Sequence, residues 1–458
     1  MKISFSSFLV LAFVAVVFVA CKKDEPTIEP EPNSPSSTYT QYGTPFNNVP
    51  ETEDVVMYEV NMRAYSAQGN LQGVINRLDQ IQELGVNVIW LMPIYTQGQL
   101  NSVGSPYCIK DYKSVSAEYG DLNTLRNLVD GAHQRGMAVM LDWVANHTSW
   151  DNGWMSHPSW YTQDGNGNII IPPGTNWQDV AELNYNIMEM QDAMIDAMTY
   201  WAYEANIDGF RCDYADGVPF EFWQRAINAI REIPNREFLF FAEGSRPDHF
   251  DAGFNMNFGW TFYGAVENVF NGYSTNTLLT ANTTENNIAP AGKAWVRFTT
   301  NHDESAWNMS PITMFGSTAA ATAASVVTIY TGGVPLIYGS QEVGTASTVP
   351  FFTNSTINWN ANPTMLQDYK DMLQAYNTLP AARRGTLSNL SSTDIFCIRK
   401  TDDNSSVVVI TNVRNANINF AIPVSLQNTT WTNAITGESI TLGASLSLPA
   451  YDYYILRN

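Results

Sequence analysis

Short apolar segments alternate with amphipathic ones along most of the chain, and this alternation constrains its fold most strongly. Apolar segments typical of strands lie at 55–61, 86–92, 137–143, 208–214, 237–243, 295–301 and 334–339, with a weaker one around 254–258. Between them, stretches such as 71–84 carry apolar residues at the three- and four-residue spacing of a helix. Near-continuous apolar strands that alternate with helices indicate a parallel sheet covered by helices. Eight such units predict a (β/α)8 TIM barrel rather than an open doubly wound sheet.

Two regions interrupt the alternation. Residues 147–186, after the third strand, contain Gly, Pro, Asn and Trp but no clear helical pattern, which predicts a long inserted loop domain. Beyond residue 382, short antiparallel-type strand patterns replace the strand–helix units. We therefore expect a barrel over 54–382, which includes the insertion, and a C-terminal antiparallel β-sandwich over 383–458.

The amino terminus has the pattern of a targeting segment. Lys2 precedes an apolar run that ends at Cys21 and is too short to span a membrane comfortably. Residues 1–21 resemble a bacterial lipoprotein signal, in which the cysteine is lipidated; an ordinary secretory signal is the alternative. Residues 22–53 are rich in Pro, Ser, Thr and acidic residues and are expected to form a flexible tether.

The lipoprotein resemblance also implies a location. It predicts that the protein is anchored through lipid on Cys21 in the outer membrane of a Gram-negative bacterium. The Lys-Lys-Asp-Glu sequence directly after Cys21 is similar to surface-export signals of some such lipoproteins, which implies exposure at the cell surface.

The balance of charge excludes one class of partner. The chain has 23 Lys and Arg against 44 Asp and Glu, a formal net charge of −21, whereas nucleic-acid binding needs clustered cations. Only 15% of the residues are charged, and 12% are aromatic. Such a surface suits a neutral, hydroxyl-rich ligand, because aromatic rings stack on the faces of sugars. The alternative is that most of these rings belong to the core.

Charged and polar side chains cluster at the ends of successive predicted strands. They are Asp142, Asn146 and His147 after the third strand, Arg211 and Asp213 at the fourth, Glu243 at the fifth, and His302 and Asp303 at the seventh. Catalytic groups of a TIM barrel lie at the carboxyl ends of its strands, and burying this much charge for packing alone is costly. Paired carboxyl groups suit glycoside hydrolysis, in which one attacks the anomeric carbon and the other protonates the leaving oxygen.

Four short segments carry a family resemblance. DWVANH (142–147), GFRCD (209–213), FAE (241–243) and TNHD (300–303) follow one another on the expected strands. In this order and spacing the chain resembles the α-amylase family, glycoside hydrolase family 13, over roughly residues 54–458. One such segment is a weak signal, whereas four in order are specific.

The resemblance implies a role for each candidate. Asp213 would be the nucleophile that forms a covalent glycosyl-enzyme, Glu243 the general acid and then base, and Asp303 the stabiliser of the distorted sugar. Arg211 would keep Asp213 ionised and oriented. Asp142 would be a scaffold carboxylate. The remaining candidates would bind the hydroxyls and face of the reacting ring: His147, His302 and Tyr107.

The same resemblance raises the question of calcium. Asn146, Asp179, Glu182 and the carbonyl of Gly217 are candidate calcium ligands, because Ca²⁺ prefers oxygen donors. The alternative is that Asn146 only hydrogen-bonds the loop and the two acids cap the following helix. No organic cofactor is expected.

Asp216 and Gly217 stand where typical α-amylases have Lys and His, so the side that binds the leaving sugar is expected to differ.

These features predict a monomeric, retaining, endo-acting hydrolase of α-1,4 bonds in starch or maltodextrin, with an α-glucan as its partner. Two alternatives stay open. One is a neopullulanase, cyclomaltodextrinase or transglycosylase that uses the same residues. The other is a starch-binding lipoprotein without catalysis, although Asp213, Glu243 and Asp303 are all present.

Overall fold

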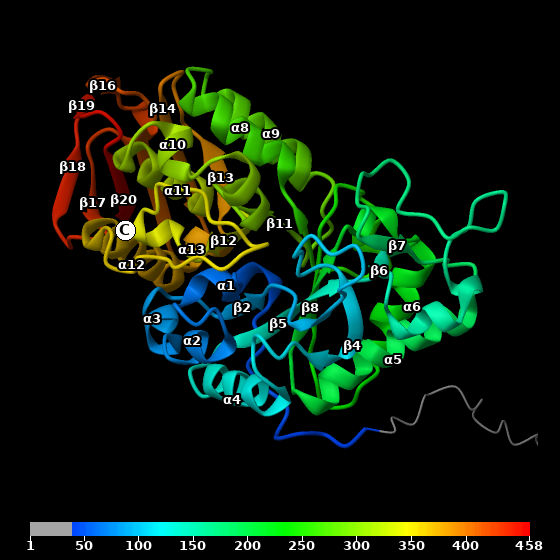
Figure 1. The fold of residues 1–458 in the computed structure, drawn as a ribbon. Coiled ribbons are helices and arrows are strands. Elements are labelled where there is room, and N and C mark those ends of the chain that lie inside the picture. The colour runs from blue at the N-terminus through cyan, green and yellow to red at the C-terminus, as the bar shows by residue number, and fades with distance from the viewer. Residues whose placement is uncertain (1–38) are drawn as a thin grey trace, which may run out of the picture. The chain divides into compact units, whose positions relative to one another are not determined.

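Eight parallel strands close into a barrel in the computed structural model, which describes residues 39–458 (Figure 1). The strands follow the order β1-β12-β11-β10-β9-β8-β5-β2 around the barrel. Their bounds are β1 (Met57–Val60), β2 (Val88–Leu91), β5 (Ala138–Val144), β8 (Gly209–Asp213), β9 (Leu239–Ala242), β10 (Met256–Phe258), β11 (Ala294–Arg297) and β12 (Val334–Tyr338). The predicted barrel is confirmed, and the weak segment around 254–258 supplies β10.

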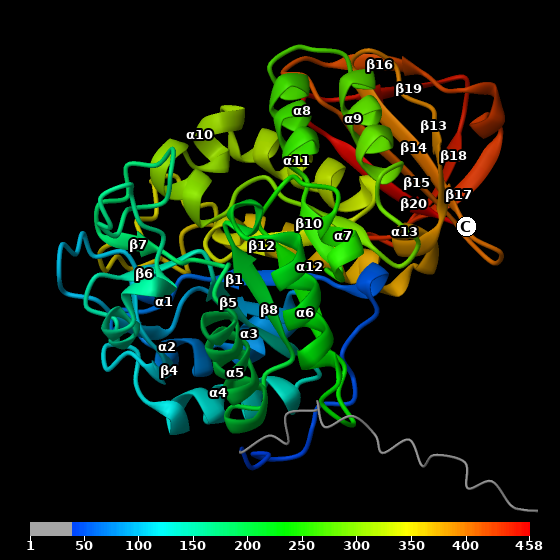
Figure 2. The ribbon, with the colours of Figure 1, turned by 90° about the vertical axis from the view of Figure 1, so that its right-hand side faces the viewer.

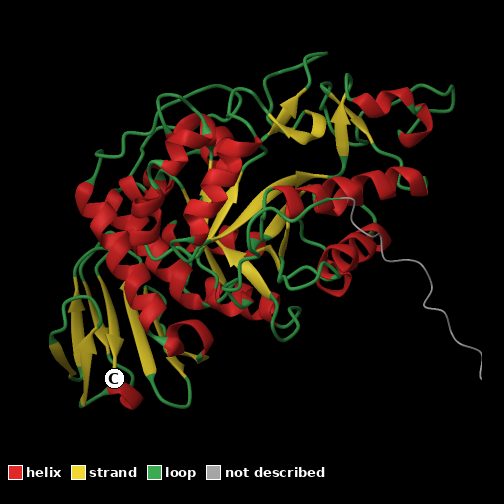
Figure 3. Ribbon diagram, turned by 90° about the horizontal axis from the view of Figure 1, so that it is seen from below, coloured by secondary structure: helices red, strands yellow, loops and turns green. Residues whose placement is uncertain are grey.

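Helices surround these strands (Figure 3). They are α1 (Met62–Tyr65), α2 (Leu71–Ile75), α3 (Leu78–Glu83), α4 (Leu122–His133), α5 (Met188–Glu204), α6 (Phe220–Arg231), α7 (His249–Ala252), α8 (Trp260–Phe270), α9 (Asn276–Asn286), α10 (Pro311–Phe315), α11 (Thr318–Thr331), α12 (Pro363–Thr378) and α13 (Pro380–Arg384). The side chain of Asp121 caps α4 by accepting the amide of Thr124 at 2.7 Å. The helix expected over 71–84 is instead two short helices, because the backbone leaves the helical conformation at Arg77.

The insertion after β5 contains little regular structure. Its antiparallel strands β6 (His147–Ser149) and β7 (Val180–Glu182) pair His147 with Glu182. A second antiparallel pair, β3 (Tyr95–Gln97) and β4 (Ile109–Val115), follows β2. In Figure 1 the β6–β7 pair lies on the side of the barrel away from the C-terminal strands.

The C-terminal region forms two antiparallel sheets. The six-stranded sheet has the order β13 (Thr386–Asn389), β14 (Ile395–Thr401), β15 (Ser406–Asn412), β20 (Tyr453–Arg457), β17 (Thr429–Asn433) and β18 (Ser439–Leu442). The smaller sheet pairs β16 (Ile418–Ala421) with β19 (Ser445–Leu448). Apolar residues of both sheets, among them Ile410 and Phe420, share one buried core. The six-stranded sheet lies beside α11 (Figure 2).

The segment before β1 packs against the barrel, which corrects part of the predicted tether. Phe46 is only 9% exposed, belongs to the same apolar cluster as Met57 of β1, and stacks on the His133 ring at 4.4 Å between centroids. The Tyr42 hydroxyl donates to Asp130 at 2.7 Å. Residues 39–53 are therefore held by buried apolar area and hydrogen bonds and are not a free tether.

The other N-terminal predictions fall outside the part of the chain that the structure describes. They are the signal over 1–21, lipidation of Cys21 and the tether over 22–38. Among residues 39–458, no helix is long and apolar enough to span a membrane.

Replacement of Phe46 tests whether this segment contributes to the fold. We expect Phe46→Ala to lower the free energy of unfolding by about 3–5 kcal/mol, because it removes a buried ring and leaves a cavity. Urea unfolding followed by tryptophan fluorescence measures the change, and Phe46→Leu, which keeps most of the apolar volume, should cost much less. A loss below about 0.5 kcal/mol, the range of ordinary surface changes, would show that the segment behaves as a tether.

Candidate active site

A cavity of about 690 Å³ lies where the predicted site residues come together. Asp213 ends β8, Glu243 follows β9, and His302 and Asp303 follow β11, so the barrel brings all of them to the carboxyl ends of its strands. The insertion contributes His147 to the same cavity. The predicted residues in its lining are Tyr107, His147, Asp179, Asp213, Glu243, His302 and Asp303.

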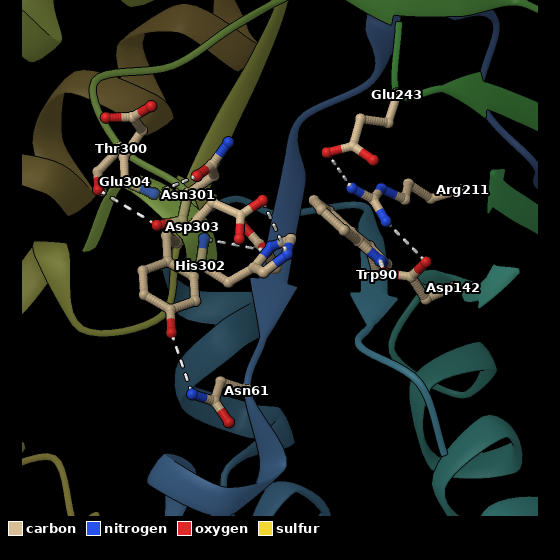
Figure 4. Close-up of polar contacts among 12 residues, drawn as sticks. Asn61, Trp90, Asp142, Arg211, Glu243, Thr300, Asn301, His302, Asp303 and Glu304 are labelled. Atoms are coloured by element: carbon tan, nitrogen blue, oxygen red, sulfur yellow. Dashed lines mark hydrogen bonds and ion pairs between the residues drawn. The ribbon is translucent and has the colours of Figure 1, made fainter. Parts of the chain in front are cut away.

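Arg211, fully buried, is the centre of the polar network (Figure 4). Its Nη1 lies 2.8 Å from Asp142 Oδ1 and 3.0 Å from Asp213 Oδ1. Its Nη2 lies 3.0 Å from Glu243 Oε1. The Trp90 ring covers the guanidinium at 4.8 Å. One cation therefore fixes the carboxyl groups of β5, β8 and the end of β9 relative to one another.

Negative charge is in excess around this guanidinium. Burial raises the pKa of Asp213 well above its ordinary value, and the Glu243 carboxyl raises it further, while Arg211 acts in the opposite direction. Burial also raises the pKa of Asp142, again against the effect of Arg211. Three carboxyl groups thus share one buried guanidinium, and its charge does not offset the effect of burial on the pKa of Asp213 or of Asp142.

Asp142 is held from several sides, as a scaffold carboxylate would be. In addition to Arg211, its Oδ2 accepts hydrogen bonds from Trp90 Nε1 and from the Tyr107 hydroxyl, both at 3.1 Å. Because Asp142 is completely buried and fully engaged, it is not free to react with a ligand.

Glu243 is positioned by the loops on either side of it. Its Oε2 accepts the amide of Tyr214 at 2.7 Å, and Tyr214 adopts a left-handed conformation with φ 41° that turns this amide toward it. After Glu243, the amide of Ser245 donates to Asp216 Oδ2 at 3.0 Å. A Cβ at Gly244 would lie 2.4 Å from Asp216 Oδ1, so only glycine fits there. Asp216, which departs from the family pattern, thus braces the loop that carries Glu243.

His302 is held between two carboxylates. Its Nδ1 donates to Glu59 of β1, and its Nε2 lies 2.8 Å from the Tyr107 hydroxyl and 3.5 Å from Asp303 Oδ2. Burial lowers the pKa of His302, but the charges of Asp303 and Glu59 outweigh burial and raise it to about 9. His302 is therefore a cation at neutral pH whose Nε2–H faces Tyr107 and Asp303 in the lining of the cavity.

Glu59 is a residue that the sequence interpretation missed. It is fully buried in β1, and its Oε1 accepts from both the ring and the amide of His302. A carboxylate in an otherwise apolar strand, VVMYEVN (55–61), is the signal that could have identified it.

His147 behaves differently from His302. It is buried at the start of β6, and this burial lowers its pKa to about 4. A hydrogen bond with the Tyr107 backbone raises the pKa by less than burial lowers it. The imidazole is therefore neutral at physiological pH. The ring lies 5.5 Å from that of Trp177, and both line the cavity. A neutral histidine can still exchange hydrogen bonds with sugar hydroxyls.

The candidate calcium ligands are only partly gathered. Asn146 and Gly217 are neighbours, since a Cβ at Gly217 would lie 2.6 Å from Asn146 Oδ1. Asp179 instead lines the cavity, and Glu182 is paired with His147 in the β6–β7 ladder. Within residues 39–458, no group of three or more His, Cys, Asp or Glu side chains is placed to hold a metal. The calcium site therefore stays a prediction.

Glu59→Gln tests the network around His302. Removing the Glu59 charge should lower the pKa of His302 from about 9, because one of the two charges that raise it is lost. NMR titration of the imidazole measures the pKa. Because folding raises the pKa of His302, the His302–Glu59 pair stabilises the folded wild type fully below pH 6.5. This stabilisation disappears as the pH rises through about 9.

The exposed Glu237→Gln serves as the matched control and should leave the pKa of His302 unchanged. An unchanged pKa of His302 in Glu59→Gln would contradict the arrangement described here.

Comparison with known proteins agrees with the motifs. The family described as alpha amylase, catalytic domain, matches residues 40–166. The α-amylase MalA of Haloarcula japonica is 26% identical over 421 residues, which cover 86% of this chain and 60% of that protein. A cyclomaltodextrinase of Geobacillus thermopakistaniensis is 24% identical, covering 84% of this chain and 70% of the relative.

A solved structure extends the likeness to the fold. The crystal structure of an α-amylase from Lactobacillus plantarum superimposes with a TM-score of 0.80 and 27% identity, covering 89% of this chain and 99% of the other. Together with the four motif segments around one barrel, these likenesses make the chain similar to glycoside hydrolases of the α-amylase family, whose catalytic-domain model residues 40–166 match.

Proposed function

We propose that the chain is a retaining, endo-acting glycoside hydrolase that cleaves α-1,4-glucosidic bonds in starch or maltodextrin. The observation that carries the proposal is the guanidinium of Arg211, which lies 3.0 Å from both Asp213 and Glu243. Two carboxyl groups held by one planar cation lie side by side at the cavity. Close spacing favours direct attack by one carboxylate, as in retaining enzymes, over a mechanism that places a water between them.

We assign each step of this reaction to a residue at the cavity. Asp213 attacks the anomeric carbon as the bond to the leaving oxygen breaks, and Glu243 gives its proton to that oxygen. In the second half, Glu243 takes a proton from a water, which attacks the same carbon and releases Asp213. Two inversions leave the anomeric configuration unchanged. Cationic His302 and the carboxylate of Asp303 hydrogen-bond the ring hydroxyls throughout.

The substrate is proposed from the cavity and the relatives together. The lining combines ionisable groups with Tyr107, Trp177, Trp307 and other rings, and such a mixture suits a neutral sugar polymer. The chain spans only 60% of the length of the α-amylase MalA, so the relative's full activity does not transfer automatically.

A second candidate is a cyclomaltodextrinase or neopullulanase activity. It is favoured by the cyclomaltodextrinase relative and by Asp216, which braces the Glu243 loop where typical α-amylases have a lysine for the leaving sugar. Product analysis on starch, pullulan and cyclodextrin separates the two. Rapid loss of starch viscosity supports endo cleavage, whereas preferred hydrolysis of cyclodextrin or pullulan supports the second candidate.

Substitution of the two carboxyl groups tests the proposal. Asp213→Asn and Glu243→Gln should each lower kcat for starch by about a thousandfold or more, because each removes a group that acts in the transition state. Reducing-sugar release measures the rate, and the exposed Asp251→Asn is the matched control with wild-type activity. Starch hydrolysis near the wild-type rate in either variant would overturn the assignment.

We also propose that the protein is lipid-anchored through Cys21 in a Gram-negative outer membrane, facing the cell surface. The support is the signal-like sequence 1–21 and the polar segment after it. Radiolabelled palmitate should enter the wild-type protein and not Cys21→Ala in the native host, and protease added to whole cells should release the labelled protein's catalytic domain. Equal labelling of both proteins would refute the anchor.

A further inference from the structure

The rim of the cavity carries an aromatic surface that the proposed mechanism does not use. Trp307 is 64% exposed and lies four residues after Asp303. Its ring lies 5.6 Å from Phe351 and 5.2 Å from Phe352, in edge-to-face contacts. These rings and Val103, itself 56% exposed, all line the same cavity. A large indole left open to water beside a candidate catalytic carboxylate needs an explanation.

The backbone under Trp307 is braced. Residues Glu304–Asn308 form a short π-helix, a rare geometry that is frequent at functional sites. Glu304 accepts hydrogen bonds from the Tyr263 hydroxyl at 2.9 Å and from Asn308 Nδ2 at 3.0 Å. The amide of Val349 donates to the Ser305 carbonyl at 3.3 Å. The segment that carries the indole is therefore held in place before any ligand arrives, which lowers the entropy cost of binding to Trp307.

The position of Trp307 relative to the reacting groups indicates on which side of the cleaved bond it lies. Phe351 connects it to the ring-binding wall, since the Phe351 ring lies 5.1 Å from His302 and 6.0 Å from Tyr107. Figure 4 shows Glu304, at the start of this segment, on the other side of His302 from Glu243. Because Glu243 protonates the leaving oxygen, the leaving sugar lies on the Glu243 side. Trp307 thus adjoins the part of the glucan that stays bound to the enzyme after the leaving sugar departs.

We propose that the Trp307 indole is a stacking platform for the glucosyl unit next to the reacting ring on its non-reducing side. The apolar C–H face of a glucosyl ring can stack on an exposed indole face, while the hydroxyls of the sugar stay solvated. The proposal rests on the proposed function and deepens it. It implies that Trp307 selects for substrates with at least two glucosyl units on that side of the bond.

Glycosyl fluorides isolate this subsite, because fluoride occupies almost no space on the leaving side. α-Glucosyl fluoride fills only the reacting-ring site, and α-maltosyl fluoride adds one unit on the non-reducing side. We expect Trp307→Ala to lower kcat/KM for α-maltosyl fluoride by about tenfold, the size of one lost stacking contact. It should leave kcat/KM for α-glucosyl fluoride unchanged within about twofold. Trp307→Phe, which keeps an aromatic face, should recover most of the loss.

Two controls keep the test decisive. Tyr273→Ala removes an exposed aromatic residue that is not among those lining the cavity, and it should affect neither substrate. Thermal unfolding and gel filtration check that Trp307→Ala keeps the fold and the oligomeric state of the wild type.

Equal losses on both fluorides, or no loss on either, would overturn the platform. A change of oligomeric state in Trp307→Ala would assign the exposed surface to contact between two copies instead and would also overturn it. Failure of the proposed function looks different, since the wild type would then hydrolyse neither fluoride.

Discussion

The buried guanidinium of Arg211 is the interaction on which the rest of the site depends. Taking an arginine out of water costs several kcal/mol unless carboxylates pair with it, and here the partners come from separate strands. In the barrel, Asp142 of β5 is in register with Arg211 of β8, and Val144 is in register with Asp213. A slip of one residue between these strands would point one partner out of the barrel. The ion cluster and the strand register therefore require each other, and the position of Asp213, the proposed nucleophile, follows from both.

A second charged link joins the first and last parts of the barrel. Glu59 comes from β1, which pairs with β12 to close the barrel, and it binds His302 after β11. One of its carboxylate oxygens, Oε2, has no hydrogen-bond partner, so the pair is retained at some cost in desolvation. This arrangement keeps His302 cationic beside Asp303, in contrast to the neutral His147, which lines the same cavity. Two histidines at one cavity thus have different charges because their neighbours differ.

Much of the fold and of the candidate site could be predicted from local sequence, whereas the rest depends on contacts between distant segments. Near-continuous apolar strands predicted the barrel, and motif residues at their ends, such as Asp213 and Glu243, come together because parallel strands end at one face. Phe46 lies in a polar, proline-rich segment that reads as a tether, and only its packing against the barrel shows otherwise. The role of Trp307 could not be predicted either, because its support comes from Phe351 and Phe352, which are more than forty residues away in the sequence.

The central claim is that Asp213 becomes covalently glycosylated while Glu243 handles the proton. The most direct measurement is mass spectrometry of the Glu243→Gln variant after incubation with α-maltosyl fluoride. Fluoride leaves without needing a proton, so Asp213 can still attack, but the intermediate lacks the base that would activate water. The account predicts a protein heavier by one maltosyl unit, attached to the peptide that contains Asp213 and absent when Asp213→Asn is added. Consumption of the fluoride without an adduct, or an adduct on another residue, would contradict it.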